Sequence, residues 1–256
     1  MKNIYKLALI AILAFSVLHA DTRLQKIVQK GELVLGTSGN MTPMTRSING
    51  GKDAVGFDID LAKTMADTMG VELVVKVMDF NKLIPALSSG KVDIVLSNMT
   101  ITPKRNTKVA FVGPYLKSGK CLITKKASLA SAQKEELNKA FNKIVVIKGS
   151  TSEDFVKIGM PKVKAITVES EEKAINMVRK SKVSAMLTDY PVCVSVVANN
   201  PKDNFIPIPS TFLSYEPIGV AIAPQNTHLL NWTQNFMIRA NEVGLFEVLG
   251  EKWLSR

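Results

Sequence analysis

An arginine follows one of the predicted strands of this chain at a point where it could hold an anion. Residues 93–96 predict a strand, and Thr102-Pro103 is typical of a helix start, with threonine as the N-cap and proline in the first turn. The turn would place Arg105 near the strand end, beside backbone amides and a threonine hydroxyl. A guanidinium held in this way can bind a carboxylate through two parallel hydrogen bonds. A solvated arginine explains this motif alone equally well.

A second candidate anion site follows the predicted strand 144–147. Residues 149–154, Gly-Ser-Thr-Ser-Glu-Asp, lead into a predicted helix, and the first amides of a helix are unpaired and favour an anion. Ser and Thr before Glu are also ordinary helix caps, which is the more common use of such a segment. The spacing of glycine and lysine excludes a nucleotide-binding P-loop.

Asp189 directly follows the predicted strand 185–188 and could attract a cation. The alternative is helix capping ahead of Pro191. Taken together, the three strand ends predict a receptor for a zwitterion. Arg105 and the Thr151 amide would bind a carboxylate, and Asp189 would bind an ammonium group.

Strands and helices alternate from residue 33 onwards, which predicts parallel sheets covered by helices in two small α/β units. The expected strands are 33–35, 71–78, 93–96, 121–124, 144–147, 165–168 and 185–188. The expected helices are 58–69, 81–88, 131–141, 153–158, 171–180, 191–198, 229–240 and 245–254. Ligands of open α/β sheets bind beyond the carboxyl ends of the strands, so we expect an interlobe ligand cleft with a hinge beside it.

The two units are expected to be two lobes of one α/β protein. The C-terminal helices follow a return crossing and would pack on the first lobe, which makes that lobe discontinuous. The expected boundaries are 21–116 with 214–256 for lobe 1 and 117–213 for lobe 2. The hinge junctions are expected at Gly113-Pro114-Tyr115 and Tyr215-Glu216-Pro217.

Residues 1–20 predict a cleaved signal peptide, with Lys2 and Lys6 ahead of a short apolar run at residues 7–18. That run is short for a membrane anchor, which needs about 20 residues. Export would place the chain in the periplasm and lower its net charge from +11 to +9. The charge suggests nucleic acid at first, but the chain has no basic stripe interleaved with aromatic residues, so we expect no nucleic-acid partner.

The chain has two histidines and two cysteines, which are too few for a multi-histidine metal site. We therefore expect no metal and no cofactor. Cys121 and Cys193 belong to an exported chain, where such pairs are often bonded. Sequence spacing leaves open whether these two form a disulfide.

Five stretches in this order resemble the solute-binding proteins of polar amino-acid ABC transporters, over residues 24–254. They are 56–62 (GFDIDLA), 79–87 (DFNKLIPAL), 99–105 (MTITPKR), 111–115 (FVGPY) and 187–189 (LTD). The resemblance implies a periplasmic-binding-protein fold whose lobes close on one free amino acid, delivered to an inner-membrane ABC permease. It also implies a ligand carboxylate on Arg105, Thr100 and Thr151, and an amino group on Asp189 and Asn98.

The resemblance further implies that Phe80 stacks on the ligand. Asn98 stands where the family usually has Gly or Ser, and Met41 stands where many relatives have a second aromatic residue, so a flexible thioether would face the ligand side chain. Selectivity for the side chain is expected from a larger set. Its members are Phe80, Met41, Ser38, Met44, Ser150, Tyr190 and Glu216. A basic ligand would gain if Glu216 points into the cleft, and a neutral one if Glu216 faces solvent.

The leading hypothesis is a monomeric binding protein without catalytic residues. An enzyme on the same fold, similar to cyclohexadienyl dehydratase, would need a general acid in the cleft, for which Glu216 and Lys148 are the candidates. A ligand sensor that presents the same lobes to a receptor is the third hypothesis.

Overall fold

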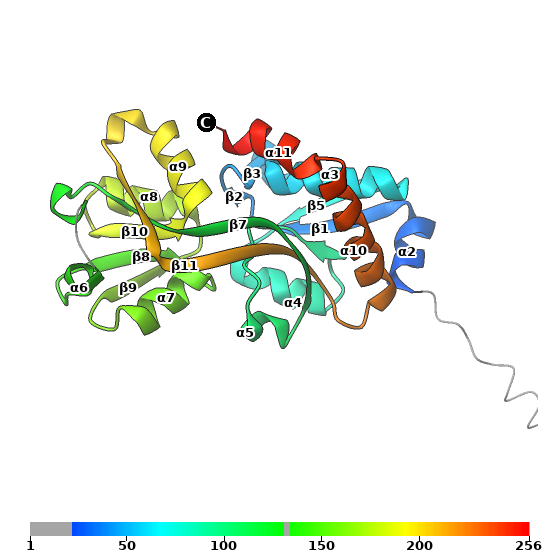
Figure 1. Ribbon diagram of the computed structural model, residues 1–256, viewed down its shortest axis with the longest axis horizontal. Coiled ribbons are helices and arrows are strands. Elements are labelled where there is room, and N and C mark those ends of the chain that lie inside the picture. Colours follow the sequence, from blue (N-terminus) through cyan, green and yellow to red (C-terminus); the bar gives the residue numbers. More distant parts are fainter. Residues whose placement is uncertain (1–21, 131–133, 256) are drawn as a thin grey trace, which may run out of the picture.

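The computed structural model describes residues 22–130 and 134–255, so the expected signal peptide lies outside the described residues. A mixed eight-stranded sheet runs through the molecule in the order β5-β1-β6-β11-β7-β10-β8-β9. Figure 1 shows two α/β lobes side by side, with the long strands β7 and β11 passing from one to the other. The family fold expected from the sequence is therefore present.

Lobe 1 is built on three parallel strands, β5 (Glu72–Val77), β1 (Glu32–Thr37) and β6 (Ile94–Val95). Leu33 and Leu35 of β1 are completely buried and share a core with the apolar face of helix α3 (Phe57–Met69). The other helices of this lobe are α2 (Arg23–Lys30), η2 (Phe80–Lys82), α4 (Leu83–Ser88), α5 (Pro103–Asn106), α10 (Thr227–Glu242) and α11 (Leu245–Leu254).

Between β1 and α3, the chain forms a small antiparallel sheet that was not predicted from the sequence. It consists of β2 (Asn40–Met41), β3 (Thr45–Ile48) and β4 (Asp53–Val55), with the 3-10 turn η1 (Asn49–Gly51) between the last two. Gly56 joins it to α3 with φ 141°, and a Cβ there would lie 2.3 Å from the carbonyl oxygen of Met44. Only glycine permits this approach, which fixes the start of α3 against residues 43–44.

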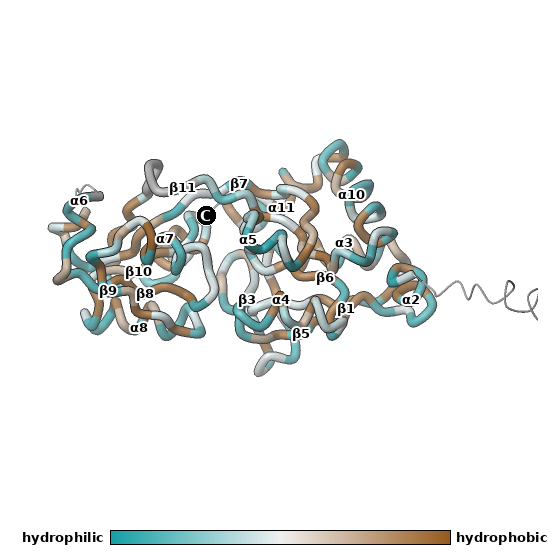
Figure 2. Tube along the Cα trace, turned by 90° about the horizontal axis from the view of Figure 1, so that it is seen from below, coloured by the Kyte–Doolittle hydropathy of each residue, from teal (hydrophilic) through white to brown (hydrophobic). Residues whose placement is uncertain are grey.

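Lobe 2 repeats the parallel pattern with β9 (Lys164–Val168), β8 (Lys143–Ile147) and β10 (Ala185–Asp189). In Figure 2, β8 and β10 are coloured mainly as hydrophobic, in keeping with the full burial of Val145, Val146 and Leu187. Its helical segments are η3 (Ala127–Leu129), α6 (Lys134–Leu137), α7 (Thr151–Gly159), α8 (Glu171–Arg179), α9 (Tyr190–Asn199) and η4 (Pro201–Asp203).

Strands β7 (Ala110–Thr124) and β11 (Ile206–Ile222) pair antiparallel and connect the lobes. The junctions expected at residues 113–115 and 215–217 fall inside these two strands. β7 pairs with β10 at its far end, and β11 pairs with β6, so each lobe takes one of them as a sheet neighbour. The lobe boundaries given above stay a prediction, because the two strands belong to both halves.

One expected helix is wrong. Residues 131–141 were expected to be helical, but helix α6 covers Lys134–Leu137, residues 138–142 are not helical, and residues 131–133 lie outside the described part. Asn142 explains the early stop, because its buried side-chain amide donates to the carbonyl oxygens of Glu136 and Leu137. The side chain thereby satisfies carbonyls that another turn of helix would have used.

The two cysteines, whose pairing the sequence left open, are bonded to each other. Cys121 of β7 and Cys193 of α9 form a disulfide, with their Cα atoms 6.0 Å apart. The bond closes a loop with a sequence separation of 72 residues and fastens α9 to the strand that enters lobe 2.

Candidate functional site

Three strands end at the junction between the lobes, and each has a predicted site residue at its end or shortly after it. Asn98 follows β6 of lobe 1, Thr151 follows β8 of lobe 2 as the first residue of α7, and Asp189 closes β10. The carboxyl ends of the strands of both lobes therefore meet at one place, as expected for ligand sites of open α/β sheets.

Arg105 is held by the short helix α5. Thr102 is the N-cap, and its hydroxyl accepts a hydrogen bond of 3.1 Å from the Arg105 backbone amide. The guanidinium donates to the Thr100 carbonyl at 2.8 Å and to the Gly149 carbonyl of lobe 2 at 3.0 Å. The side chain is 9 % exposed, so the solvated alternative does not describe it. Burial lowers the pKa of Arg105, and the nearby carboxylates of Asp189 and Glu216 oppose that shift.

Asp189 is the N-cap residue of α9, but its side chain makes no capping hydrogen bond. Its carboxylate instead accepts from the Asn98 side chain of lobe 1 at 2.7 Å and from the Lys120 ammonium at 2.6 Å. The alternative that the Asp189 carboxylate caps helix α9 is therefore wrong. Asp189 faces the junction between the lobes with both of its oxygens.

Lys120 is a site residue that the sequence reasoning missed. It lies on β7 directly opposite Asp189 in the antiparallel register, and its side chain is 1 % exposed. Besides Asp189, its ammonium contacts the Thr151 hydroxyl at 2.7 Å and a Glu216 carboxylate oxygen at 3.4 Å. The sequence offered only a weak signal, a lysine directly before the apolar strand 121–124. A lysine at such a place is usually solvated, and it can be buried only where carboxylates pair with it.

Two hydroxyl groups and a carboxylate complete this cluster. The Thr151 hydroxyl donates to Glu216 at 2.9 Å and lies 3.4 Å from the Thr100 hydroxyl of lobe 1. Glu216 is 4 % exposed and lies on β11, so it points into the cluster and not into solvent. Both threonines and Glu216 are therefore beside Arg105 and Lys120.

Asn98 has a left-handed backbone with φ 49°, a conformation that asparagine tolerates better than most residues. Its backbone amide donates to one oxygen of the Asp58 carboxylate at 2.6 Å, and the Tyr115 hydroxyl donates to the other oxygen at 2.7 Å. Burial raises the pKa of Asp58 to about 7, against the effect of these two hydrogen bonds. The Asn98 side-chain oxygen is buried and accepts no hydrogen bond. Asp58 thus fixes the residue that offers an unused acceptor beside Asp189.

Three of the residues expected to contact the ligand side chain are buried, and one of them, Phe80, contacts the polar cluster. Phe80 is buried, and the Arg105 guanidinium carbon stands 5.4 Å above its ring centre, within cation–π distance. Met41 is 7 % exposed and packs in the same apolar cluster as Phe80. Ser38 follows β1 and is buried, with its hydroxyl 2.9 Å from that of Ser97.

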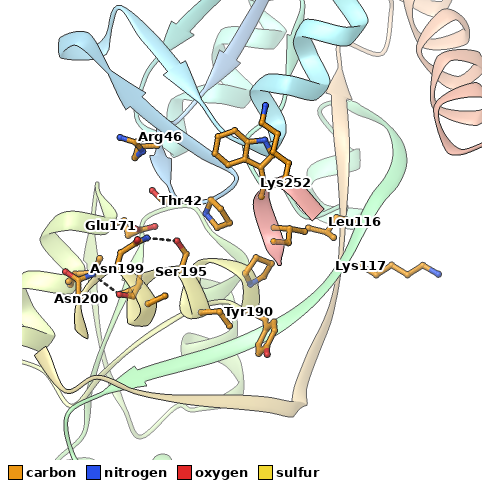
Figure 3. Close-up of a pocket in the computed structure, with 18 residues that line it drawn as sticks. Thr42, Arg46, Leu116, Lys117, Glu171, Tyr190, Ser195, Asn199, Asn200 and Lys252 are labelled. Carbon is orange, nitrogen blue, oxygen red and sulfur yellow. Dashed lines mark hydrogen bonds between the residues drawn. The ribbon is translucent and has the colours of Figure 1, made fainter. Parts of the chain in front are cut away.

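Three further residues expected to contact the ligand side chain, Met44, Ser150 and Tyr190, make contacts outside the polar cluster. Met44 is fully buried in the core of lobe 1 with α3. Ser150 caps α7, donating to the Ile147 carbonyl and accepting from the Glu153 amide. Tyr190 is 47 % exposed and lines a pocket of about 750 Å³. Figure 3 shows that pocket between α9, the C-terminal helix and the β2–β3 hairpin, and the residues that line it do not include the polar cluster.

The arrangement is suited to binding a charged ligand. The Lys120 ammonium pairs with both Asp189 and Glu216, and the Arg105 guanidinium is near the same two carboxylates and bonded to the Thr100 and Gly149 carbonyls. Buried charges of both signs at one place suit a small molecule that also carries both. Within the described residues, no group of three His, Cys, Asp or Glu side chains could hold a metal ion. Nor does any helix in the described part have the length and apolar character to cross a bilayer.

Residues 33–256 match the family model described as bacterial extracellular solute-binding proteins, family 3. The chain belongs to this family. The ABC transporter arginine-binding protein 1 of Escherichia coli K12 is 27 % identical to it over 255 residues, covering 99 % of both chains. The cyclohexadienyl dehydratase of Pseudomonas aeruginosa is 30 % identical over 186 residues, covering 72 % of this chain and 69 % of the enzyme.

A solved structure agrees with the family assignment. It is an ancestral amino-acid-binding protein described as a precursor of cyclohexadienyl dehydratase, 36 % identical, with a TM-score of 0.82 over 90 % of this chain and 99 % of that one. The two-lobe architecture seen here is thus shared by a solved amino-acid-binding protein. The family is extracytoplasmic, and the dehydratase relative makes the enzyme hypothesis one to be tested.

Proposed function

We propose that this protein captures a free α-amino acid between its two lobes in the periplasm and delivers it, as a monomer, to an ABC permease in the inner membrane. One observation carries the proposal. Arg105 and Asp189 reach the junction from opposite lobes, and hydrogen bonds through Thr100, Thr151 and Lys120 connect them. A ligand with a carboxylate and an ammonium group can bridge them, and binding such a ligand favours the state in which the lobes are together.

The proposed roles follow from chemistry and position. Arg105 and the hydroxyl groups of Thr100 and Thr151 bind the carboxylate of the ligand. Asp189 binds the ammonium group, and the side-chain oxygen of Asn98 accepts a second hydrogen bond from it. That oxygen is buried without a partner, which is costly unless a donor arrives. Phe80, Met41, Ser38 and Glu216 are the residues proposed to contact the ligand side chain. Met44, Ser150 and Tyr190, which the sequence also suggested, have their contacts elsewhere in this structure and are not part of the proposal.

The test is calorimetry on the purified mature protein with each of the twenty amino acids. At least one amino acid should bind with saturable heat and raise the melting temperature. Mass spectrometry of any small molecule that copurifies would identify the ligand directly. If none of the twenty binds, the proposal is wrong.

An enzymatic role is the second candidate, favoured by the dehydratase relative and by the two buried groups Lys120 and Glu216, either of which could exchange a proton with a ligand. Lys148, the other sequence candidate, pairs with Glu169 and is half exposed. We propose that the protein is not an enzyme. Incubation with prephenate or arogenate should yield no aromatic product, and appearance of that product would establish the dehydratase instead.

A sensor role makes a separate prediction for cells. If the protein serves a permease, a strain that lacks it should lose high-affinity uptake of the ligand. Unchanged uptake together with a lost response to the ligand would support the sensor hypothesis.

Replacing Arg105 tests the assigned carboxylate site. Arg105→Met should weaken amino-acid binding by about a hundredfold or more, because it leaves a buried ligand carboxylate without its cation. Arg239→Met is the matched control, since Arg239 is exposed on α10 and pairs with Glu242 on the surface. Affinity should be unchanged in the control, and circular dichroism should show that both variants are folded. Full affinity in Arg105→Met would refute the carboxylate role.

A further inference from the structure

Lys120 is the most unusual side chain of the site. Its side chain is 1 % exposed, and three oxygen-bearing groups surround its ammonium: Asp189 at 2.6 Å, Thr151 at 2.7 Å and Glu216 at 3.4 Å. Lysine is rarely buried in this way unless carboxylates pair with it. Asp189 and Glu216 are the two carboxylates proposed to receive a cationic part of the ligand. Lys120 therefore competes with the ligand for both.

The count of formal charges in the cluster limits the charge of the ligand. Arg105 and Lys120 are balanced by Asp189 and Glu216, so the cluster is neutral before a ligand enters. A zwitterion with an uncharged side chain keeps the closed site neutral. A basic amino acid adds one uncompensated positive charge and an acidic one adds a negative charge, and an unpaired charge in a buried site is costly.

We infer that Lys120 is the specificity-determining residue of this cleft and that it selects a neutral polar α-amino acid over basic ones. The inference rests on the proposed function. It reverses what the position of Glu216 alone suggests, because Lys120 already occupies the carboxylate that would attract a basic side chain. Each carboxylate still has acceptor sites for the ammonium group of the ligand, since an ionised carboxylate can accept about four hydrogen bonds. The Lys120 ammonium, which has three donors, can also reach a polar side chain of the ligand.

The register of the sheet explains why Lys120 cannot leave the site easily. It stands opposite Asp189 between the disulfide-bonded Cys121 and Gly119, in the part of β7 that pairs with both β10 and β11. Its backbone is fixed on both sides, so the ammonium stays near the two carboxylates. The positive charge that neutralises the two carboxylates thus belongs to β7, one of the two strands that connect the lobes.

The experiment compares dissociation constants of neutral polar, basic and acidic amino acids for the wild type and Lys120→Met, at about pH 6, where Asp58, with a pKa of about 7, is mostly protonated. The wild type should bind its best neutral ligand at least about tenfold more tightly than lysine or arginine. Lys120→Met leaves the cluster with an extra negative charge and should reverse that order. Lys117→Met is the matched control, because Lys117 is exposed on the same strand, and it should bind like the wild type.

A second variant covers the case in which Lys120→Met does not fold. Glu216→Gln gives the cluster an extra positive charge and should shift preference the other way, towards glutamate and aspartate by about tenfold. The inference is overturned if the wild type prefers basic amino acids, or if amino acids bind but neither variant changes the ratio between ligand classes. Absence of binding to any of the twenty by the wild type is a different result, which refutes the proposed function itself.

Discussion

Asp58 is a buried carboxyl group that acts on the site through Asn98, to which it is hydrogen-bonded. It lies in the first turn of α3 with no exposed surface, and it holds Asn98 in place through the Asn98 amide. Desolvation is the largest cause of its raised pKa. The native state therefore holds this proton to a higher pH than the unfolded chain does.

The raised pKa predicts a pH dependence of stability. Between about pH 4 and about pH 7 the native state binds more protons at Asp58 than the unfolded state, so the free energy of unfolding should fall as pH rises through this range, by a few kcal/mol. Asp58→Asn removes this term and should flatten the profile. Urea unfolding at about pH 5 and about pH 8 measures the slope.

Asp67→Asn is the control for the Asp58 measurement, because Asp67 is exposed on the same helix and pairs with Lys63. Its profile should run parallel to that of the wild type. An Asp58→Asn profile as steep as the wild type would show that another group titrates, such as Glu171, whose pKa burial also raises.

Individual site residues differed in how far the sequence could predict them. Arg105 and Asp189 stand directly after predicted elements, where capping and strand ends restrict the possibilities, and the structure brings both to the junction of the lobes. Lys120 could not be found in this way, because a lysine before a strand is usually solvated. Its burial depends on pairing with Asp189 and Glu216, which are 69 and 96 positions further along the chain.

At the scale of elements, α5 shows how one cap can position a binding group. The helix spans Pro103–Asn106, and its start is set by the Thr102 hydroxyl bonded to the Arg105 amide. One turn of helix has little stability of its own. The cap therefore contributes to where the Arg105 side chain lies as well as to the helix.

Thr102→Ala should cost about 1 kcal/mol of stability and also weaken ligand binding. Ser170→Ala is the matched control, because Ser170 caps α8 by accepting from the Lys173 amide and makes no described contact with the polar cluster. The control should lose similar stability in chemical denaturation and keep its affinity in calorimetry. Equal affinities for the two variants would show that the cap does not position Arg105.

The parallel strands and most helices could be predicted, since their periodicity comes from burial on a covered sheet. The two long strands could not. β7 contains Gly113, Pro114 and Gly119 within Ala110–Thr124, which interrupt the alternation of apolar and polar residues. They are strands because each pairs with the other along most of its length, which is a long-range contact. The expected helix at residues 131–141 failed for a similar reason, since the side chain of Asn142 binds carbonyls that periodicity does not consider.

At the scale of the whole molecule, function depends on how the lobes meet. β7 and β11 join them on one side, and between them the contacts include Asn98 with Asp189, Thr100 with Thr151, Arg105 with the Gly149 carbonyl and Asn40 with the Glu169 carbonyl. An exposed ion pair adds to these, with the Lys104 ammonium of α5 3.1 Å from Asp154 of α7. These contacts exist only while the lobes are together, so each one favours the closed state to which a ligand binds.

The exposed pair between Lys104 and Asp154 allows that linkage to be measured with residues that are not proposed to contact the ligand. Lys104→Ala and Asp154→Asn should each weaken ligand affinity by about two- to fourfold, the range expected of a surface ion pair, and the double variant should be no weaker than either single one. Lys63→Ala is the control, because its ion pair with Asp67 lies within α3 and does not span the lobes. Because salt screens exposed charges, the difference from wild type should shrink at high ionic strength. Additive losses in the double variant would mean that the two residues act separately, and the closed state would then depend on the buried contacts alone.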